Sequence, residues 1–84
     1  MRQQIVAGNW KMNKTLEEGL ELTRAILEKV EKPSGLVVIA PPYPYLRELG
    51  KMLKVRKHFH LAAQNCHQEE KGAYTGEVSA DMLS

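Results

Sequence analysis

Short apolar runs and longer amphipathic stretches alternate along the chain, and they predict strands and helices in turn. Residues 4–8 and 36–40 are short runs dominated by apolar and β-branched side chains, which is typical of buried strands. The run at 36–40 has no polar alternation. Such a strand has both faces covered, as in a parallel sheet flanked by helices. A third strand is predicted at residues 59–65, where the run ends in polar groups.

The first amphipathic stretch predicts a helix that begins after Thr15. Thr15 and Glu18 have the spacing of a capping box, in which each side chain bonds the other residue's backbone N–H. Apolar or small residues then recur every three or four positions, as on one face of a helix. They are Leu16, Gly19, Leu20, Thr23, Ile26, Leu27 and Val30. The Pro-Ser-Gly sequence at residues 33–35 ends this helix.

Two further helices are expected later in the chain. Pro44 suits the first turn of a helix that extends to about Leu53. The inner face of this helix is formed by Leu46, Leu49, Met52 and Leu53. A glycine-containing loop at residues 66–76 follows the third predicted strand, and Ser79 and Asp81 then begin a third helix. We expect that helix to be incomplete where the sequence stops at Ser84.

The predicted order is therefore β-α-β-α-β-loop-α, with strands about 30 residues apart, as βαβ units require. Two α/β architectures have this order, an open doubly wound sheet and a (β/α)8 barrel, and periodicity does not decide between them. Neither closes with three strands, and right-handed crossovers would still leave the outer strands unpaired. We interpret the chain as one incomplete domain.

Composition and charge exclude several classes of protein. With 43% hydrophobic and 26% charged residues, the chain has the make-up of a globular protein rather than a disordered one. Its net charge of +2 is too small for a nucleic-acid-binding surface, which needs basic residues gathered on one face. One short basic run exists, formed by Lys51, Lys54, Arg56, Lys57 and His58. We expect a solvated helix end and linker there, with a binding patch as the alternative.

Cys66 is the only cysteine, so no internal disulfide can form, which favours a reducing compartment. The sequence shows no leader peptide, and no apolar run approaches the roughly 20 residues that span a bilayer. We therefore expect a cytoplasmic protein that does not associate with membranes.

Candidate chemistry lies directly after the first predicted strand, where Asn9 and Lys11 flank Trp10. Ligands of both α/β architectures bind at the carboxyl ends of strands, so Lys11 is placed to meet an anionic substrate. Asn9 offers both a donor and an acceptor. The alternative is a surface lysine beside a turn asparagine, and position alone leaves it open. Trp10 is expected to pack rather than to stack on a ligand.

Four sequence motifs point to one family. They are Ala-Gly-Asn-Trp-Lys-Met-Asn at residues 7–13, Ala-Pro-Pro at 40–42, Ala-Gln-Asn at 63–65 and Gly-Ala-Tyr-Thr-Gly-Glu-Val-Ser at 72–79. Together they resemble the first, second and third strands and the third loop of triosephosphate isomerase, in that family's order and spacing. The resemblance covers residues 7 to 79, nearly the whole chain. It implies that the chain is the N-terminal part, residues 1–84, of a single (β/α)8 barrel.

The resemblance also implies an activity. Members of this family interconvert dihydroxyacetone phosphate and glyceraldehyde 3-phosphate, in glycolysis and gluconeogenesis, as homodimers and without a metal or cofactor. In that enzyme, itself a standard example of tuned acid–base chemistry, a glutamate moves the proton and a neutral histidine polarises the carbonyl. A phosphate-gripping lid excludes water. The substrate would thus be a small phosphorylated triose, with no nucleic acid or membrane partner.

Residue roles follow from the matched motifs. Lys11 matches the lysine that binds substrate and stabilises the negative charge of the enediolate. Asn9 matches the asparagine that hydrogen-bonds the substrate and orients that lysine. Thr75 matches the third-loop threonine that reaches the active site of the neighbouring subunit. Structural roles in shaping the first and third loops are implied for Gln64, Asn65, Gly76 and Glu77.

The family's catalytic histidine and glutamate have no match in this chain. None of His58, His60 and His67 fits the histidine motif, and their spacing, with Cys66, gives no zinc site. Cys66 itself is expected to be a small residue under the third loop. Glu69 and Glu70 are expected to be solvated. We therefore predict that the chain alone is inactive as an isomerase.

Two other functions remain as alternatives. The chain could be a non-catalytic folding or interaction module whose unpaired strand edges dock onto a complementary fragment or another subunit. It could also be an unrelated doubly wound domain. A glycine-rich phosphate loop after the first strand would favour that fold. Residues 8–11 have neither the GxGxxG pattern nor the Walker spacing.

Overall fold

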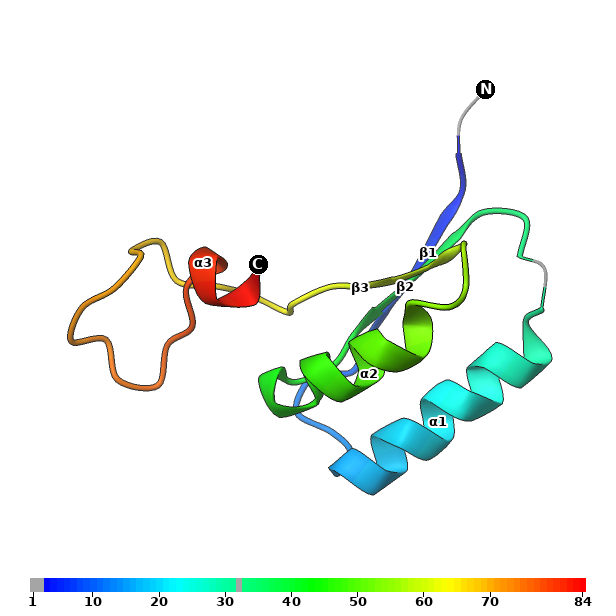
Figure 1. The fold of residues 1–84 in the computed structure, drawn as a ribbon, viewed down its shortest axis with the longest axis horizontal. Coiled ribbons are helices and arrows are strands. Elements are labelled where there is room, and N and C mark those ends of the chain that lie inside the picture. The colour runs from blue at the N-terminus through cyan, green and yellow to red at the C-terminus, as the bar shows by residue number, and fades with distance from the viewer. Residues whose placement is uncertain (1–2, 32) are drawn as a thin grey trace.

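The computed structural model describes residues 3–31 and 33–84. Its elements, in chain order, are β1 (Ile5–Asn9), α1 (Leu16–Lys29), β2 (Leu36–Ala40), the 3-10 turn η1 (Tyr43–Tyr45), α2 (Leu46–Leu53), β3 (Phe59–Leu61) and α3 (Ala80–Leu83). The predicted β-α-β-α-β-loop-α order is confirmed (Figure 1). None of the helices within the described ranges is long and apolar enough to cross a membrane.

The three strands form one parallel sheet in the order β1-β2-β3. In the register of the sheet, Gly8 lies opposite Ile39, and Ile39 lies opposite Leu61. Helix α2 packs against β3, and helix α1 packs beside α2 on the same side of the sheet (Figure 1). All three strands run the same way, so their carboxyl ends meet at one edge, where α/β proteins bind ligands.

The buried core lies between the sheet and α2. It consists of Ile39, Leu49, Leu53 and Phe59, each at most 4% exposed. Leu49 and Leu53 were both predicted for the inner face of α2. Pro44 lies in the short η1 turn that precedes α2, where its missing N–H costs no helical hydrogen bond. The predicted second helix is confirmed, and a 3-10 turn directly precedes it.

Helix α1 begins as predicted. The Glu18 N–H donates to Thr15 Oγ1 at 3.3 Å, and the Thr15 N–H donates to Glu18 Oε1 at 2.9 Å, which completes the capping box. The hydrogen bonds from Thr15 hold the pKa of the Glu18 carboxyl below its ordinary value. One turn later, Gly19 makes room for Trp10, because a Cβ at Gly19 would come within 2.9 Å of the indole ring. Trp10 packs against the core, as predicted.

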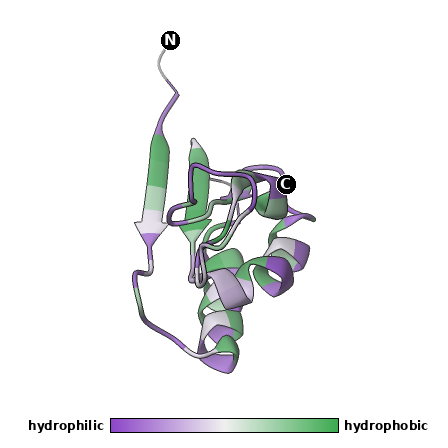
Figure 2. Ribbon diagram, turned by 90° about the vertical axis from the view of Figure 1, so that its left-hand side faces the viewer, coloured by the Kyte–Doolittle hydropathy of each residue, from purple (hydrophilic) through white to green (hydrophobic). Residues whose placement is uncertain are grey.

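Strand β1 was expected to be buried and strand β2 to have both faces covered, and both expectations are wrong for the described chain. Ile5 is 62% exposed and Val6 is 68% exposed, because β1 forms the outer edge of the sheet and α1 does not cover it (Figure 2). In β2, Ile39 alone is buried, because the helices cover only one face of the sheet. An open groove of about 450 Å³ remains between β1 and α1. Apolar groups from Val6, Gly8, Trp10, Ile26, Val37 and Ile39 are among those that line it.

Strand β3 ends at Leu61, not at residue 65 as expected. The Ala62 N–H still donates to the Ile39 carbonyl at 2.9 Å. Beyond that point β2 is followed by Pro41 and Pro42, which have no N–H to offer, so the ladder cannot continue. Residues 63–65 therefore leave the sheet and reach the edge where the other strands end.

The expectation of a wholly solvated basic run is wrong at Arg56. Its guanidinium donates to the carbonyls of Leu27 (2.9 Å), Val30 (2.8 Å) and Glu31 (2.9 Å), and it lies 4.9 Å from the ring centroid of Phe59. The last carbonyls of a helix have no partner within the helix, and a cation there also interacts favourably with the helix dipole. Lys51, Lys54 and Lys57 are exposed, as expected.

Candidate active site

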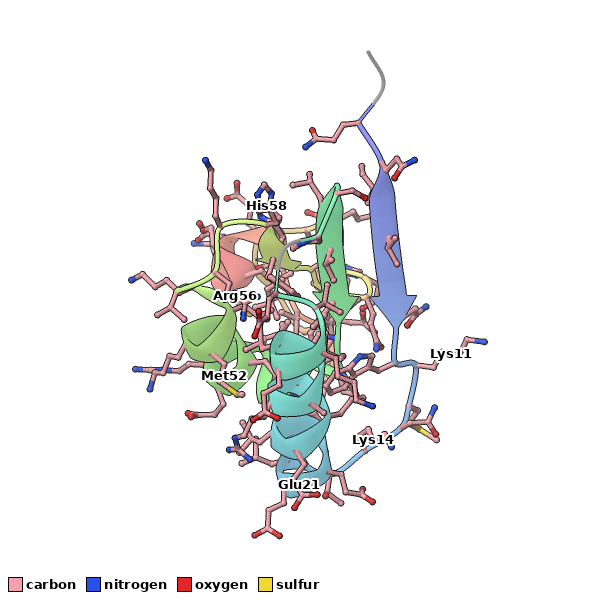
Figure 3. The ribbon with its side chains drawn as sticks, turned by 90° about the vertical axis from the view of Figure 1, so that its right-hand side faces the viewer. Lys11, Lys14, Glu21, Met52, Arg56 and His58 are labelled. Atoms are coloured by element: carbon pink, nitrogen blue, oxygen red, sulfur yellow. The ribbon has the colours of Figure 1, made fainter. Side chains whose placement is uncertain are left out.

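The predicted site residues Asn9 and Lys11 lie at the carboxyl edge of the sheet, with Gln64 beside them. Asn9 is the last residue of β1, Lys11 belongs to the first loop (residues 10–14), and Gln64 follows β3. Figure 3 shows the Lys11 side chain projecting away from the sheet, above Lys14 in the same loop. The parallel sheet thus brings together residues that are 53 positions apart in the chain.

The side chain of Asn9 shapes the start of the first loop. Its Oδ1 accepts a hydrogen bond from the Lys11 N–H at 2.9 Å, which forms a local turn typical of asparagine. The amide nitrogen remains a donor, so it is the group with which Asn9 can meet a substrate oxygen. Asn9 therefore orients the backbone of Lys11 and keeps a donor for a ligand.

Lys11 has an unusual backbone conformation, with φ at +57°. Lys14, at the end of the same loop, has φ at +78°. For a residue with a Cβ this left-handed region costs about 1–2 kcal/mol, so surrounding contacts must hold the loop there. Within the described ranges the ion pairs are Glu48–Lys51 and Glu77–His67, so no carboxylate there neutralises the Lys11 ammonium.

Gln64 provides one of those contacts. Its Nε2 donates to the Lys11 carbonyl at 3.0 Å and to the Ala40 carbonyl at 2.8 Å. The Trp10 N–H donates to the same Ala40 carbonyl at 3.1 Å. The end of β2, the start of the first loop and the segment after β3 are thereby joined at one point. This agrees with the structural role expected for Gln64.

Two tyrosines at this edge were not identified in the sequence. Tyr43 donates from its hydroxyl to the Asn65 carbonyl at 2.6 Å and also contacts the Asn65 side chain. Burial raises the pKa of Tyr43, and the nearby Cys66 and Glu77 act in the same direction. Tyr45 donates to the Lys14 carbonyl at 2.8 Å. Nothing in their sequence spacing connects them to loops 22 and 31 positions away.

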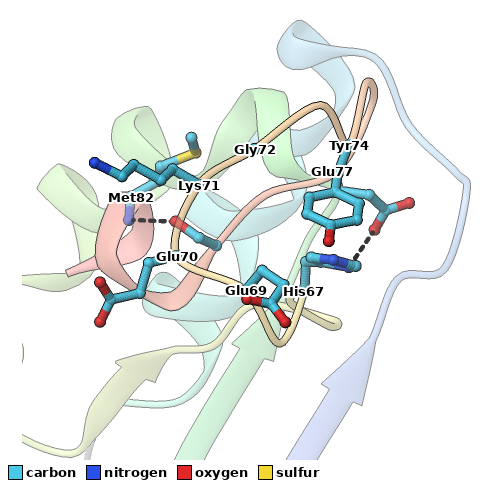
Figure 4. A pocket seen from close by; sticks show the side chains of 9 residues that line it. His67, Glu69, Glu70, Lys71, Gly72, Tyr74, Glu77 and Met82 are labelled. Carbon is cyan, nitrogen blue, oxygen red and sulfur yellow. Dashed lines mark hydrogen bonds and ion pairs between the residues drawn. The ribbon is translucent and has the colours of Figure 1, made fainter.

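The third loop (residues 66–78) is closed at its base and extends beyond the sheet and its two covering helices (Figure 1). The His67 N–H donates to the Val78 carbonyl at 2.7 Å. Inside the loop, the His67 ring lies 4.3 Å from that of Tyr74, and its Nδ1 lies 3.9 Å from Glu77 Oε2 (Figure 4). A small cavity of about 160 Å³ lies beside these rings. Gly76 has φ at +89°, so glycine suits this position in the turn at residues 74–77.

Thr75 is exposed in the turn that the Glu77 N–H closes on the Tyr74 carbonyl, and Glu69 and Glu70 are exposed as expected. Cys66 is also exposed, so the prediction that it lies under the third loop is wrong. The chain has left the sheet after Leu61, so Cys66 lies outside the packed strands.

The histidines are not brought to Asn9 and Lys11. His58 and His60 lie at the start of β3, whereas the candidate site is at the carboxyl edge, and His67 is held inside the third loop. Across residues 3–31 and 33–84, no cluster of histidine, cysteine and carboxylate side chains is suited to hold a metal ion. What the sheet assembles is an unneutralised lysine and an amide on a fixed backbone, which can bind an oxyanion and stabilise developing negative charge.

Comparison with known proteins gives one family. The family model for triosephosphate isomerase matches residues 4–84. The triosephosphate isomerase of Chlorobium phaeobacteroides is 52% identical over 99% of this chain and 34% of the relative. That of Alkaliphilus oremlandii is 49% identical over 99% of this chain and 33% of the relative. That of Bacteroides fragilis is 46% identical over the whole chain and 34% of the relative. The chain thus spans about a third of the length of these curated relatives.

Proposed function

Because this chain belongs to the triosephosphate isomerase family, we propose that it forms part of a triosephosphate isomerase. The enzyme interconverts dihydroxyacetone phosphate and D-glyceraldehyde 3-phosphate in glycolysis and gluconeogenesis, in the cytoplasm. Residues 1–84 belong to a single (β/α)8 barrel, of which the described parallel strands are three. The observation that carries the proposal is the fixed Asn9–Lys11 turn, tied to Gln64 at the carboxyl edge of the sheet.

Lys11 acts on the negative charge of the substrate and of the reaction intermediate. At about 4 Å, a pair of unit charges interacts by about 4 kcal/mol at an effective dielectric constant of about 20. Removal of a proton beside the substrate carbonyl creates an enediolate, which is more negative than the ground state at that oxygen. A cation held in place before the reaction stabilises this species more than it stabilises the substrate. Lys11 therefore increases kcat as well as affinity.

Asn9 has two tasks in this proposal. Its carbonyl oxygen holds the Lys11 backbone, and its amide nitrogen donates to a substrate oxygen. Proton transfer itself needs a base and a neutral electrophile. The family motif supplies neither within residues 1–84, so the chain alone binds the anion weakly and does not isomerise it.

Thr75 belongs to a contact between subunits. It is exposed in a loop whose base is closed and whose interior is packed by its own side chains. This loop extends beyond the sheet and its two covering helices (Figure 1). Such a loop is suited to reach the active site of a neighbouring copy, and we include a homodimer through the third loop in the proposal.

Steady-state kinetics test the proposal directly. The full-length protein that contains this chain should isomerise glyceraldehyde 3-phosphate, whereas the purified chain of 84 residues, free of the parent enzyme, should give only the buffer rate. Turnover by the isolated chain would contradict the assignment of acid and base to residues outside it. A full-length protein that binds triose phosphates but does not isomerise them would contradict the activity itself.

A second candidate function is supported by the exposed edge of the sheet. The apolar side chains of Ile5 and Val6 are largely exposed, and a groove of about 450 Å³ lies beside them. An isolated chain with this edge would act as a folding or interaction module that pairs with a complementary fragment. Sedimentation of the isolated chain shows whether it is a monomer or an assembly. A stable helical monomer would contradict a need for a partner.

A further inference from the structure

The first loop carries two strained residues, and both of their carbonyls are held by side chains from distant elements. Lys11 has φ at +57° and its carbonyl accepts from Gln64 at 3.0 Å. Lys14 has φ at +78° and its carbonyl accepts from the Tyr45 hydroxyl at 2.8 Å. Gln64 lies at the candidate active site, but the proposed isomerase function gives no role to the hydrogen bond from Tyr45 to Lys14.

Tyr45 is itself fixed in position. It is the last residue of η1, it immediately precedes α2, and its ring packs against the buried core of Ile39, Leu49, Leu53 and Phe59. Its hydroxyl therefore has little freedom to follow the loop if the loop moves. A hydrogen bond from such a group fixes the loop to the body of the protein, not to another mobile segment.

The remaining loop residues lie between fixed points. Asn9 Oδ1 holds the Lys11 N–H at 2.9 Å, and Asn13 Nδ2 donates to the Trp10 carbonyl at 2.9 Å. Directly after Lys14, the capping box fixes Thr15 at the start of α1. Met12, which is 95% exposed, lies between the two strained residues. The conformation of Lys14 therefore determines how the loop that carries Lys11 enters α1.

We propose that Tyr45 is a positioning residue for Lys11. Its hydroxyl holds the left-handed conformation of Lys14 and so maintains the loop geometry in which the Lys11 ammonium meets the substrate anion. The inference rests on the proposed isomerase function for its kinetic consequence, but the structural contact can be measured without any activity. Tyr45 itself touches neither substrate nor the reacting atoms.

The first test is hydrogen–deuterium exchange of the full-length protein with Tyr45→Phe, which removes the hydroxyl and keeps the ring. Loss of one neutral hydrogen bond should increase amide exchange in residues 10–15 about threefold. The control is Ser34→Ala, which removes a hydroxyl hydrogen bond to Gln4 at the opposite end of the sheet and should leave exchange in residues 10–15 unaltered. Unchanged exchange in the Tyr45→Phe protein would overturn the proposal, whether or not the protein is an isomerase.

The second test separates positioning from a general loss of stability. At a temperature where both proteins are fully folded, Tyr45→Phe should lower kcat/KM about three- to tenfold, mainly through kcat. Glycine adopts positive φ without strain, so in a Lys14→Gly background the same Tyr45→Phe change should have a clearly smaller effect. An equal effect in both backgrounds would overturn the positioning role. Absence of isomerase activity in the unmodified full-length protein would instead contradict the proposed function and leave the exchange test to decide the contact.

Discussion

The first loop and the third loop both follow strands of the same parallel sheet, but their contacts go to different places. The first loop is tied to the body of the protein by Gln64 and Tyr45, which come from beyond β3 and from η1. The third loop is closed on itself through His67, Tyr74 and Val78. Contacts within the same chain therefore fix the position of the first loop. Contacts inside the third loop fix its shape but not its position.

This difference agrees with the two roles proposed for them. A group that stabilises charge in a transition state must be in place before the reaction, because reorganisation during the reaction would consume part of the benefit. A loop that contacts another subunit gains its position from that subunit. Three substitutions and one change of pH test this difference between the two loops.

Lys11→Met should have the largest effect. The substitution keeps much of the side-chain volume and removes the charge, so we expect kcat/KM of the full-length enzyme to fall by about 10²-fold or more. The control is Lys57→Met, which removes an exposed lysine on another part of the chain. Near-normal kinetics for Lys11→Met would reassign Lys11 to the surface and remove the distinction between the loops.

Thr75→Arg should act on assembly instead. A long charged side chain at the loop tip would be buried without a partner in the subunit contact, so we expect the dimer dissociation constant to rise about tenfold or more. Analytical ultracentrifugation over a range of protein concentrations measures it. An unchanged dissociation constant would place the tip of the third loop outside the interface.

Gln64→Leu should give a moderate effect. It removes both hydrogen bonds that join Lys11 and Ala40 to the segment after β3, and two neutral hydrogen bonds together correspond to about a tenfold change. We expect kcat/KM to fall by about that factor while the dimer dissociation constant stays the same. Gln3→Leu, on an exposed residue ahead of β1, serves as the control. A change in dimerisation without a change in kinetics would assign Gln64 to the third loop instead.

The smallest effect concerns pH and the start of α1. The hydrogen bonds from Thr15 lower the pKa of Glu18 from its ordinary value of 4.5, so the ionised capping box stabilises the folded state above that pH. Stability from this group should be lost as pH falls below 4.5 through the folded-state pKa. Thermal unfolding of the full-length protein from pH 6 to pH 3 should therefore show a slightly steeper acid dependence than that of Glu18→Gln. An identical dependence would mean that the capping box does not contribute.

Much of the fold was predictable because local sequence determines it. The capping box at Thr15, the apolar run at 36–40 and the helix that ends at Leu53 are signalled by neighbouring residues, and the structure confirms all of them. The exposure of Ile5 and Val6 was not predictable in this way. The apolar sequence of a strand indicates that its faces are suited to burial. It does not indicate whether other residues of the described chain pack on those faces.

The candidate site was predictable to a lesser degree. Asn9 and Lys11 follow directly from the end of a strand and from a specific motif. The parts played by Tyr45 and Arg56 depend on carbonyl groups 31 and up to 29 positions away, and a backbone carbonyl has no sequence signature. The positive φ of Lys11 and Lys14 was missed for the same reason, because strain in non-glycine residues is imposed by distant contacts.

The contrast between the loops can be measured most directly by hydrogen–deuterium exchange of the full-length protein at a series of dilutions that spans dimer dissociation. We predict that exchange in residues 10–15 rises only slightly, because its tethers come from the same chain and dissociation removes only the contact with the neighbouring third loop. Exchange in residues 72–77 should rise much more as the dimer dissociates. An equal response of both segments to dilution, or a loss of protection in the first loop alone, would contradict the claim that contacts within its own chain fix the first loop.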